Sequence, residues 1–410
     1  MSAPELYTEA IKLLSTCVTE HGFIASPSNS ANYNRIWARD GIIMGLSALL
    51  SREQILIHSF KNTLLTLSLH QGPHGEIPSN YDHLSQRISY GGTTGRVDAN
   101  LWFIIGCCEY WFETQDEDFL QTILPCLEKV RFLLGAWEFN NRGLIYVPQA
   151  GDWADEYLQS GYVLYDQVLY YRALESICAL HNHIHNSQDH ELISKTQQLK
   201  HLIQTNYWLG ETDSDRDIYH EVLYEKGLKS RTECRNQYWM PFFSPSGYGY
   251  RFDSFANILV SIFGISNLEQ QDRVDQYIDS ITTKQLNLIP AFHPVILPVD
   301  KDWEELQMTF SFTFKNNPYE YHNGGLWPML SGFYVYDLCQ RGLYKLANEY
   351  TNSINRANNL EYHEMKPSFP EFLHGQTLHP GGTLQQGWSA AASVISHHAL
   401  LGEKLFRDIA

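Results

Sequence analysis

Apolar residues recur at helical spacing in segment after segment of this chain, and most of these segments come in pairs. No convincing pattern of alternating strands and helices lies between them, which disfavours a TIM or Rossmann fold. The predicted helices span residues 4–20, 40–51, 53–70, 98–114, 117–138, 164–180, 189–206, 253–264, 269–283, 326–341, 343–358 and 386–400. Pairing them gives about six helical hairpins, with the first and last helices as the partners that close a ring. The sequence therefore predicts an all-α fold, an (α/α)6 barrel of inner and outer helices, as a single domain over residues 1–410.

In such a ring the loops at one end converge over the axis, and several loops here carry polar and aromatic side chains. The first loop contains Trp37, Arg39 and Asp40. Asp40 can accept and Arg39 can donate hydrogen bonds to neighbouring sugar hydroxyls, while the indole ring covers the apolar face of the sugar. The alternative for this loop is a helix start that Asp40 caps and where it pairs with Arg39.

Three further stretches offer groups of the same kind. Asp98 follows a glycine-rich loop and is either a sugar ligand or a helix N-cap. Residues 315–328 contain two glycines that let the backbone approach a ligand, and His322 and Asn323 offer hydrogen bonds beside them. Gln386 and Trp388 stand where the last helix begins.

Two acidic stretches far apart in the chain, residues 151–157 and 368–375, set carboxylates among aromatic residues and turn formers. Hydrolysis of a glycosidic bond requires one protonated carboxyl and one ionised carboxylate. Repulsion between Asp152 and Asp155, with aromatic neighbours, is expected to raise one of the two pKa values. We predict Asp155 as the general acid and Asp152 as a ligand of sugar hydroxyls, although the sequence leaves the reverse open. Glu371 is the predicted general base, and Glu364 competes with it.

Composition narrows the class of ligand. The formal net charge is −17 and no run of basic residues occurs, which argues against nucleic acid as a partner. The 10 Trp, 25 Tyr and 20 Phe suit a small carbohydrate, because a sugar ring stacks on an aromatic face. The chain shows no signal sequence and no apolar run long enough for a membrane. Its seven cysteines form no C-x-x-C motif, so we expect reduced thiols in the cytoplasm.

His181, His183 and His185 alternate after a predicted helix. Metal ligands on a strand can follow this spacing, but on a helix it does not put the three rings on one face. We therefore predict no metal and no other cofactor. A homo-oligomer is possible.

The motifs, taken together, resemble the neutral and alkaline invertases, glycoside hydrolase family 100. The segments that carry the resemblance are Asn32-Tyr33 with Arg39-Asp40, Gly95-Arg96-Val97 with Leu101-Trp102, Arg251-Phe252 with Asn257, Lys315-Asn316 with Tyr321-His322-Asn323-Gly324-Gly325 and Trp327-Pro328, and Pro370-Glu371 with Gln386 and Trp388-Ser389. The resemblance implies an (α/α)6 barrel that hydrolyses sucrose with inversion and without a metal. It puts the family's catalytic Asp on Asp155 and its catalytic Glu on Glu371. The substrate-binding candidates are Tyr33, Trp37, Arg39, Asp40, Asp98, Trp102, Asp152, Arg251, His322, Asn323, Gln386 and Trp388.

The chain departs from the family pattern at the acid. The family typically has I-D-R-R-M-G, whereas this chain has Ala154-Asp155-Glu156-Tyr157-Leu158-Gln159, without the arginines. The aglycone therefore stays open.

Inversion requires the two carboxyl groups to be ~6.5–9.5 Å apart, and a separation near ~5 Å indicates retention. The alternatives are an α-glucosidase of the debranching or glucosylglycerate type, a sugar epimerase that uses His322, and a non-catalytic sugar-binding protein.

Overall fold

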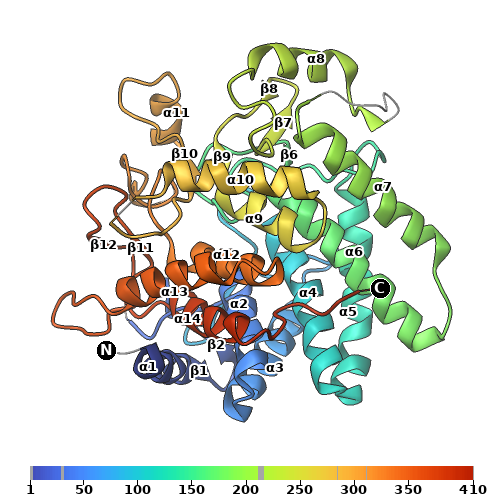
Figure 1. Cartoon of the computed structure of the whole chain (residues 1–410). Coiled ribbons are helices and arrows are strands. Elements are labelled where there is room, and N and C mark those ends of the chain that lie inside the picture. Colours follow the sequence, from blue (N-terminus) through green and yellow to red (C-terminus); the bar gives the residue numbers. More distant parts are fainter. Residues whose placement is uncertain (1–2, 29–31, 211–216, 284, 311, 410) are drawn as a thin grey trace.

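The computed structural model describes residues 3–28, 32–210, 217–283, 285–310 and 312–409, and its fold is dominated by helices (Figure 1). The helices are α1 (Ala3–Thr16), α2 (Ala38–Ser51), α3 (Gln54–Leu69), α4 (Val97–Thr114), α5 (Glu117–Ala136), α6 (Leu164–His185), α7 (His190–Tyr207), α8 (Glu221–Ser230), α9 (Ser254–Ile262), α10 (Leu268–Ile281), α11 (Trp303–Gln307), α12 (Pro328–Gln340), α13 (Tyr344–Asn358) and α14 (Gly387–Leu400). The predicted helices all occur, with ends displaced by a few residues.

Six of these helices form a closed circuit of contacts. Going round it, α2 contacts α4, α4 contacts α6, α6 contacts α9, α9 contacts α12, α12 contacts α14, and α14 returns to α2. Further helices lie outside the circuit, where α3, α5, α7 and α13 each contact their predecessor in the chain and α1 contacts α14. The first and last helices are therefore partners, as the sequence predicts.

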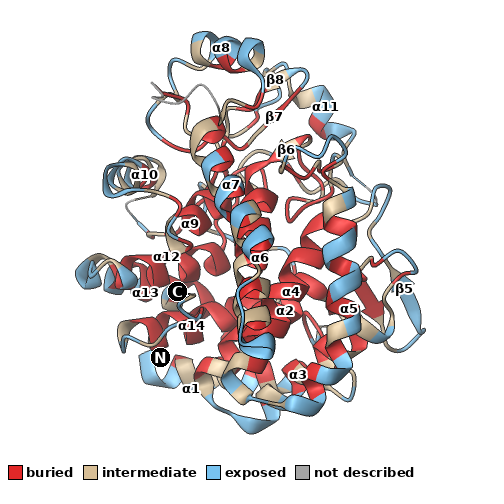
Figure 2. Cartoon of the chain, turned by 90° about the vertical axis from the view of Figure 1, so that its right-hand side faces the viewer, coloured by how far each residue is buried: buried red, intermediate tan, exposed pale blue. Residues whose placement is uncertain are grey.

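Burial separates the two sets of helices (Figure 2). Every residue of α4 from Val97 to Trp111 is buried, whereas α10 buries only Val274 and Ile278. A helix that is apolar on all sides must be enclosed, and one with a single apolar stripe lies at the surface. The core of the molecule is the ring itself.

Short strands tie the loops together ahead of the inner helices. The strands are β1 (Val18–Thr19), β2 (Gly22–Phe23), β3 (Ile36–Trp37), β4 (Asn80–Asp82), β5 (Arg87–Ser89), β6 (Tyr162–Val163), β7 (Phe242–Ser244), β8 (Gly247–Tyr248), β9 (Phe252–Asp253), β10 (Phe292–His293), β11 (Phe372–Leu373) and β12 (Pro380–Gly381). They pair antiparallel in the orders β1-β2, β3-β4-β5, β6-β7-β8, β10-β9 and β11-β12. Since β3, β6 and β9 run directly into α2, α6 and α9, these ladders fix where the inner helices begin.

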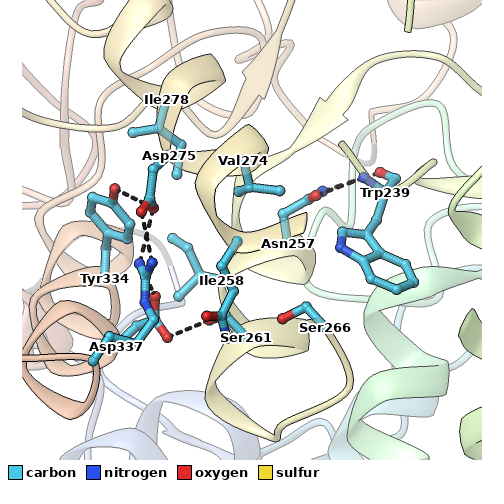
Figure 3. Close-up of a pocket in the computed structure, with 12 residues that line it drawn as sticks. Trp239, Asn257, Ile258, Ser261, Ser266, Val274, Asp275, Ile278, Tyr334 and Asp337 are labelled. Atoms are coloured by element: carbon cyan, nitrogen blue, oxygen red, sulfur yellow. Dashed lines mark hydrogen bonds and ion pairs between the residues drawn. The ribbon is translucent and has the colours of Figure 1, made fainter. Parts of the chain in front are cut away.

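A polar cluster fastens the outer helix α10 to the ring (Figure 3). Arg341 donates from Nη1 to Asp275 of α10 at 2.7 Å and from Nη2 to Asp337 of α12 at 2.7 Å. The hydroxyls of Tyr334 and Ser261 donate to the same two carboxylates, at 2.7 and 2.6 Å. A cavity of about 10 Å³ beside the cluster has room for one water molecule. The cluster gives α10 a polar attachment to α12, and it joins α12 to α9.

Several local predictions were wrong. Asp40 does not cap α2 and Asp98 does not cap α4, because these helices begin earlier and their N-caps are Trp37 and Arg96. His181, His183 and His185 do not follow a helix, since α6 continues to His185. Helices α8 and α11 were not predicted. Pro328 does occupy the first turn of α12, and Gln386 is the N-cap of α14.

All seven cysteines are free thiols. None of the helices in the described ranges has the length and apolar character needed to cross a membrane. Over the same ranges, no group of three or more His, Cys, Asp or Glu side chains is arranged to hold a metal ion.

Candidate active site

A cavity of about 820 Å³ opens where the inner helices begin. Its lining comes from the first loop, from β4 and β5, from the loops ahead of α6 and α12, and from the last loop. The lining residues are Asn32, Tyr33, Arg35, Trp37, Arg39, Asp40, Ser79, Asn80, Arg87, Ile88, Ser89, Tyr90, Gly91, Gly92, Gly95, Arg96, Trp153, Asp155, Glu156, Phe312, Thr313, Lys315, Tyr321, His322, Trp327, Glu371, Gln386 and Trp388. The loops that the sequence singled out therefore meet around one space.

Glu371 lies at the wall of this cavity with 2% of its surface exposed. The hydroxyl of Tyr33 lies 2.7 Å from Oε1 and 2.9 Å from Oε2, and the backbone N–H of Thr383 donates to Oε2 at 3.0 Å. Gly382 has a positive φ of 71°, and a side chain there would collide with Oε2. Burial raises the pKa of Glu371, while Lys315 and the Tyr33 hydrogen bond oppose that rise. Among the described residues, hydrogen-bond donors therefore fix the position of this carboxylate.

Asp155 lines the same cavity, and its Oδ2 lies 3.2 Å from Nη2 of Arg96. Burial alone would raise the pKa of Asp155, but Arg96 and other nearby cations outweigh burial and lower it below its usual value. The raised pKa that the sequence predicts for one of Asp152 and Asp155 is therefore not that of Asp155.

Asp152 is the carboxyl whose pKa is raised. Its side chain is buried. Oδ1 accepts from the backbone N–H of Ala154 at 2.9 Å, and Oδ2 accepts from Nε2 of Gln159 at 2.9 Å. Burial raises its pKa well above the usual range, and the carboxylates of Asp253 and Asp98 raise it further. Asp152 does not line the cavity, so its carboxyl supports the loop rather than facing substrate.

Charged and polar groups at the starts of α2, α4 and α14 form one connected set. Nη1 of Arg39 lies 2.5 Å from Oδ2 of Asp98, and Nε2 of Gln386 donates to Oδ1 of Asp40 at 3.0 Å. Burial raises the pKa of Asp40 to about 7, against the opposing charge of Arg39. The guanidinium of Arg39 also lies 5.9 Å from the centre of the Trp388 ring. These contacts hold donors and acceptors at the cavity floor.

Aromatic side chains form another part of the lining. The ring of His322 stacks on Trp327 at 5.3 Å and meets Trp153 edge-on at 5.0 Å. Burial lowers the pKa of His322 to about 3, so the imidazole is neutral at ordinary pH. Trp388 meets Trp327 edge-on at 5.4 Å. Trp153 and His322 are 1% exposed and Trp327 is 0% exposed, so these rings support the lining from behind, and Trp388, at 4%, is the one of the four that offers aromatic surface to a sugar.

Some predicted ligands lie away from the cavity. Trp102 is fully buried below it and donates from Nε1 to the hydroxyl of Tyr165 at 2.7 Å. Asn323 bonds backbone groups of Ile296, with its Oδ1 accepting at 2.7 Å. Asp98 reaches the cavity only through Arg39, and Arg251 lies in a second cleft. Glu364 is exposed and outside the cavity lining, so the cavity favours Glu371 over its competitor.

Sequence reasoning missed Lys315, Arg96 and Trp327, although it quoted the motifs that contain them. Nζ of Lys315 lies 5.0 Å from the ring centre of Tyr321 and 5.7 Å from that of Tyr33, and its charge acts on both Asp155 and Glu371. A lysine directly before the Asn-Asn-Pro turn of a glycine-rich loop was the available signal.

Curated relatives of this chain are plant enzymes. It is 23% identical over 436 residues to alkaline/neutral invertase E, chloroplastic, of Arabidopsis thaliana, covering 93% of this chain and 69% of that protein. It is 21% identical over 415 residues to cytosolic invertase 1 of Oryza sativa subsp. japonica, covering 89% of this chain and 71% of the relative.

Two solved structures have a similar fold. The GH63 mannosylglycerate hydrolase from Thermus thermophilus, in complex with Tris, superposes with a TM-score of 0.66 at 13% identity over 95% of this chain and 99% of its own. A bacterial glucoamylase in complex with acarbose gives 0.64 at 14% identity over 97% and 55%.

The family model described as alkaline and neutral invertase matches residues 8–222 and 213–402, nearly the whole chain. With the invertase relatives and the glycosidase-like fold, this match makes the protein a glycoside hydrolase. The chain belongs to the alkaline and neutral invertase family.

Proposed function

We propose that this enzyme hydrolyses the α-glucosidic bond of sucrose with inversion, using Asp155 and Glu371 as general acid and general base. The observation that carries the proposal is that these two carboxyls, from loops far apart in the chain, line one cavity in different hydrogen-bonding environments. We also infer that the closed circuit of inner helices and its outer partners form an (α/α)6 barrel.

Glu371 has the surroundings expected of the base. Burial raises its pKa, but the hydrogen bonds from Tyr33 and Thr383 and the charge of Lys315 limit this rise, so that the carboxylate can take a proton from water. Tyr33 keeps its own proton, because burial and the nearby Glu371 raise its pKa well above the usual value. In the proposed reaction Glu371 deprotonates a water molecule, which attacks the anomeric carbon from the face opposite the leaving group.

Asp155 must be protonated to act as the acid, yet Arg96 favours its ionised form. We infer that the proton arrives with substrate. A sugar that displaces water from beside Asp155 strengthens the effect of burial, which already raises the pKa of this carboxyl. Asp155 then protonates the glycosidic oxygen as the bond to the anomeric carbon breaks.

The remaining cavity groups bind the glucosyl unit in this proposal. Asp40 and Arg39 hold vicinal hydroxyls, and Trp388 covers the ring. No metal or other cofactor takes part. His322 is assigned a hydrogen-bonding role, since its lowered pKa is poorly suited to the acid/base part that an epimerase would require.

A second candidate is an α-glucosidase that acts on another small α-glucoside. The family's two arginines after the acid are replaced by Glu156 and Tyr157, and Tyr157 lines a second cleft together with Leu158 and Gln159. The mouth carries other groups instead, among them Arg87, Tyr90 and Phe312. These supply an aglycone site with a different set of contacts.

The deciding experiment is glucose release by the purified protein from sucrose, maltose, isomaltose, trehalose and glucosylglycerate, with Asp155→Asn as the blank. We expect selective release from sucrose, and release of β-glucose as the first product by NMR. Turnover of another glucoside but not sucrose would establish the second candidate. Full activity of Glu371→Gln would eliminate Glu371 as the base, and binding without turnover of any substrate would indicate a non-catalytic sugar-binding protein.

A further inference from the structure

A second cleft of about 290 Å³ lies on the other side of the catalytic loop. Asp155 and Glu156 line the catalytic cavity, whereas the next four residues, 157–160, line this cleft together with β7, β8 and the segment around Asp302. The loop therefore separates the catalytic cavity from the second cleft and contributes side chains to both. A volume of this size is near the lower end of the range for small-molecule sites.

Aromatic rings and a charge pair line the cleft. Tyr157 stacks on Phe292 at 4.3 Å, and the ring of Tyr250 has the guanidinium of Arg231 at 4.9 Å and that of Arg251 at 4.6 Å. Nη1 of Arg251 lies 2.7 Å from Oδ2 of Asp302. A donor and an acceptor side by side against aromatic faces suit the vicinal hydroxyls and the apolar face of a sugar.

Buried polar atoms of the lining lack partners. The hydroxyl of Tyr157, Oε1 of Gln159 and Nε of Arg251 make no hydrogen bond with any part of the chain that the structure describes. Tyr157 is 1% exposed and Gln159 is 2% exposed. Since buried polar groups in proteins almost always have a partner, the lining keeps hydrogen-bonding capacity that the described part of the chain does not use.

The charges of the lining indicate whether a ligand of this cleft is charged or neutral. Arg251 and Asp302 neutralise each other, and Arg231 bonds the backbone carbonyl of Tyr248 at 2.7 Å. Lys301 and Glu305 are of opposite sign at the rim. We propose that the cleft is a second carbohydrate-binding site that takes one neutral saccharide unit, either a free sugar or the terminal unit of a longer glucoside.

The cleft is also connected to the catalytic loop. Gln159 lines it with one side and donates to Asp152 at 2.9 Å, while Asp152 accepts from the backbone of Ala154, next to Asp155. A sugar hydroxyl bound by Gln159 therefore acts on the segment that positions the acid. This consequence rests on the proposed function, and it makes kcat depend on occupancy of the second site.

Ser246→Trp tests the site, because Ser246 is an exposed lining residue whose enlargement fills the cleft. Ser187→Trp, on an exposed turn after α6, is the matched control. We expect calorimetric titration with glucose or fructose to give two binding sites per chain in the wild type and the control, and one in Ser246→Trp. If Ser246→Trp does not fold, Tyr250→Ala should weaken the second site at least tenfold.

Longer sugars distinguish the two sources. Monosaccharides that fill the second site identify a free sugar, whereas a second contact seen only with maltotriose bound to Asp155→Asn, and lost on adding Ser246→Trp, identifies the end of an extended substrate. One site per chain for every sugar tested would overturn the proposal. Because binding is measured without turnover, this failure is independent of whether the enzyme cleaves sucrose.

Discussion

The hydroxyl of Tyr33 lies within hydrogen-bonding distance of both carboxylate oxygens of Glu371, at 2.7 and 2.9 Å, although 338 residues separate the two in the chain. Tyr33 belongs to the loop before the first inner helix and Glu371 to the loop before the last. Closure of the ring therefore brings Glu371, the proposed base, together with its hydrogen-bond donor. The site exists only when the two ends of the chain meet.

Replacing Tyr33 by Phe should raise the pKa of Glu371 further, because the lost hydrogen bond favours the ionised form. A hydrogen bond to a charged group contributes about 1.5 kcal/mol or more, which corresponds to about one pKa unit. The base must be ionised, so the acidic limb of the pH profile of kcat/KM should move up by about one pH unit. Tyr321→Phe removes a hydroxyl from the same cavity and is the control. An unmoved acidic limb in Tyr33→Phe would contradict the assigned role of Glu371.

Arg96→Gln should act on the other limb. Removing the cation raises the pKa of Asp155, and since the acid must be protonated, the basic limb of kcat/KM should move to higher pH. Arg96→Lys keeps the charge and should leave that limb nearly in place. Both variants lose some of the bonds that Arg96 makes to the carbonyls of Gly95 and Ala150. An equal shift of the basic limb in both variants would show that the change comes from an altered loop and not from the lost charge.

The fold was predictable because helical periodicity is a local property of each segment. The first and last helices pair because every other predicted helix already has its chain neighbour as a partner. The loops around the cavity were predictable because Arg-Asp, Gly-Asp-Trp and His-Asn-Gly-Gly are unusual groupings of polar, aromatic and turn residues. The sequence could not show which way each side chain points. Asp98 and Trp102 occupy consecutive turns of α4, a helix buried on all sides, so nothing local shows which side chains reach the cavity.

Long-range partners explain the remaining differences. Arg251 was grouped with the substrate ligands, but Asp302, in a segment after β10, holds it in the second cleft. The pKa of Asp155 depends on Arg96, 59 residues earlier. Asp40 lies inside α2 because pairing of β3 with β4 ends at Trp37 and the helix starts at once. Each of these outcomes is set by tertiary contacts, which a local pattern does not contain.

The buried ion pair of Arg39 and Asp98 should be important for stability. Their side chains are 10% and 2% exposed, and breaking a buried pair by removing one partner leaves an uncompensated charge. We expect Asp98→Ala to lower the free energy of unfolding by about 3–5 kcal/mol in urea denaturation. Glu9→Ala, which removes an exposed pair with Lys12, should cost less than about 1 kcal/mol. Equal losses in the two variants would show that burial of the pair is not the cause.

The contribution of Asp253 to the free energy of unfolding decreases as pH rises. Burial raises the pKa of this carboxyl from 3.8 to about 7, while hydrogen bonds from Ala256, Trp153 and Gln159 oppose the rise. Between those two values the folded state holds a proton that the unfolded state has lost, so the free energy of unfolding decreases across this window. At 1.36 kcal/mol per pKa unit, the decrease attributable to Asp253 is about 4 kcal/mol.

Asp253→Asn tests this effect without removing the cap of α9, since Asn also accepts at an N-cap and Asp253 caps the helix through Ala256 at 3.1 Å. Urea denaturation of both proteins at a series of pH values from about 4 to 8 gives the difference in unfolding free energy. We expect Asp253→Asn to gain on the wild type by about 4 kcal/mol across the series, because the neutral amide does not titrate. A difference that stays constant with pH would mean that Asp253 is ionised in the folded protein, with its charge balanced by the hydrogen bonds it accepts.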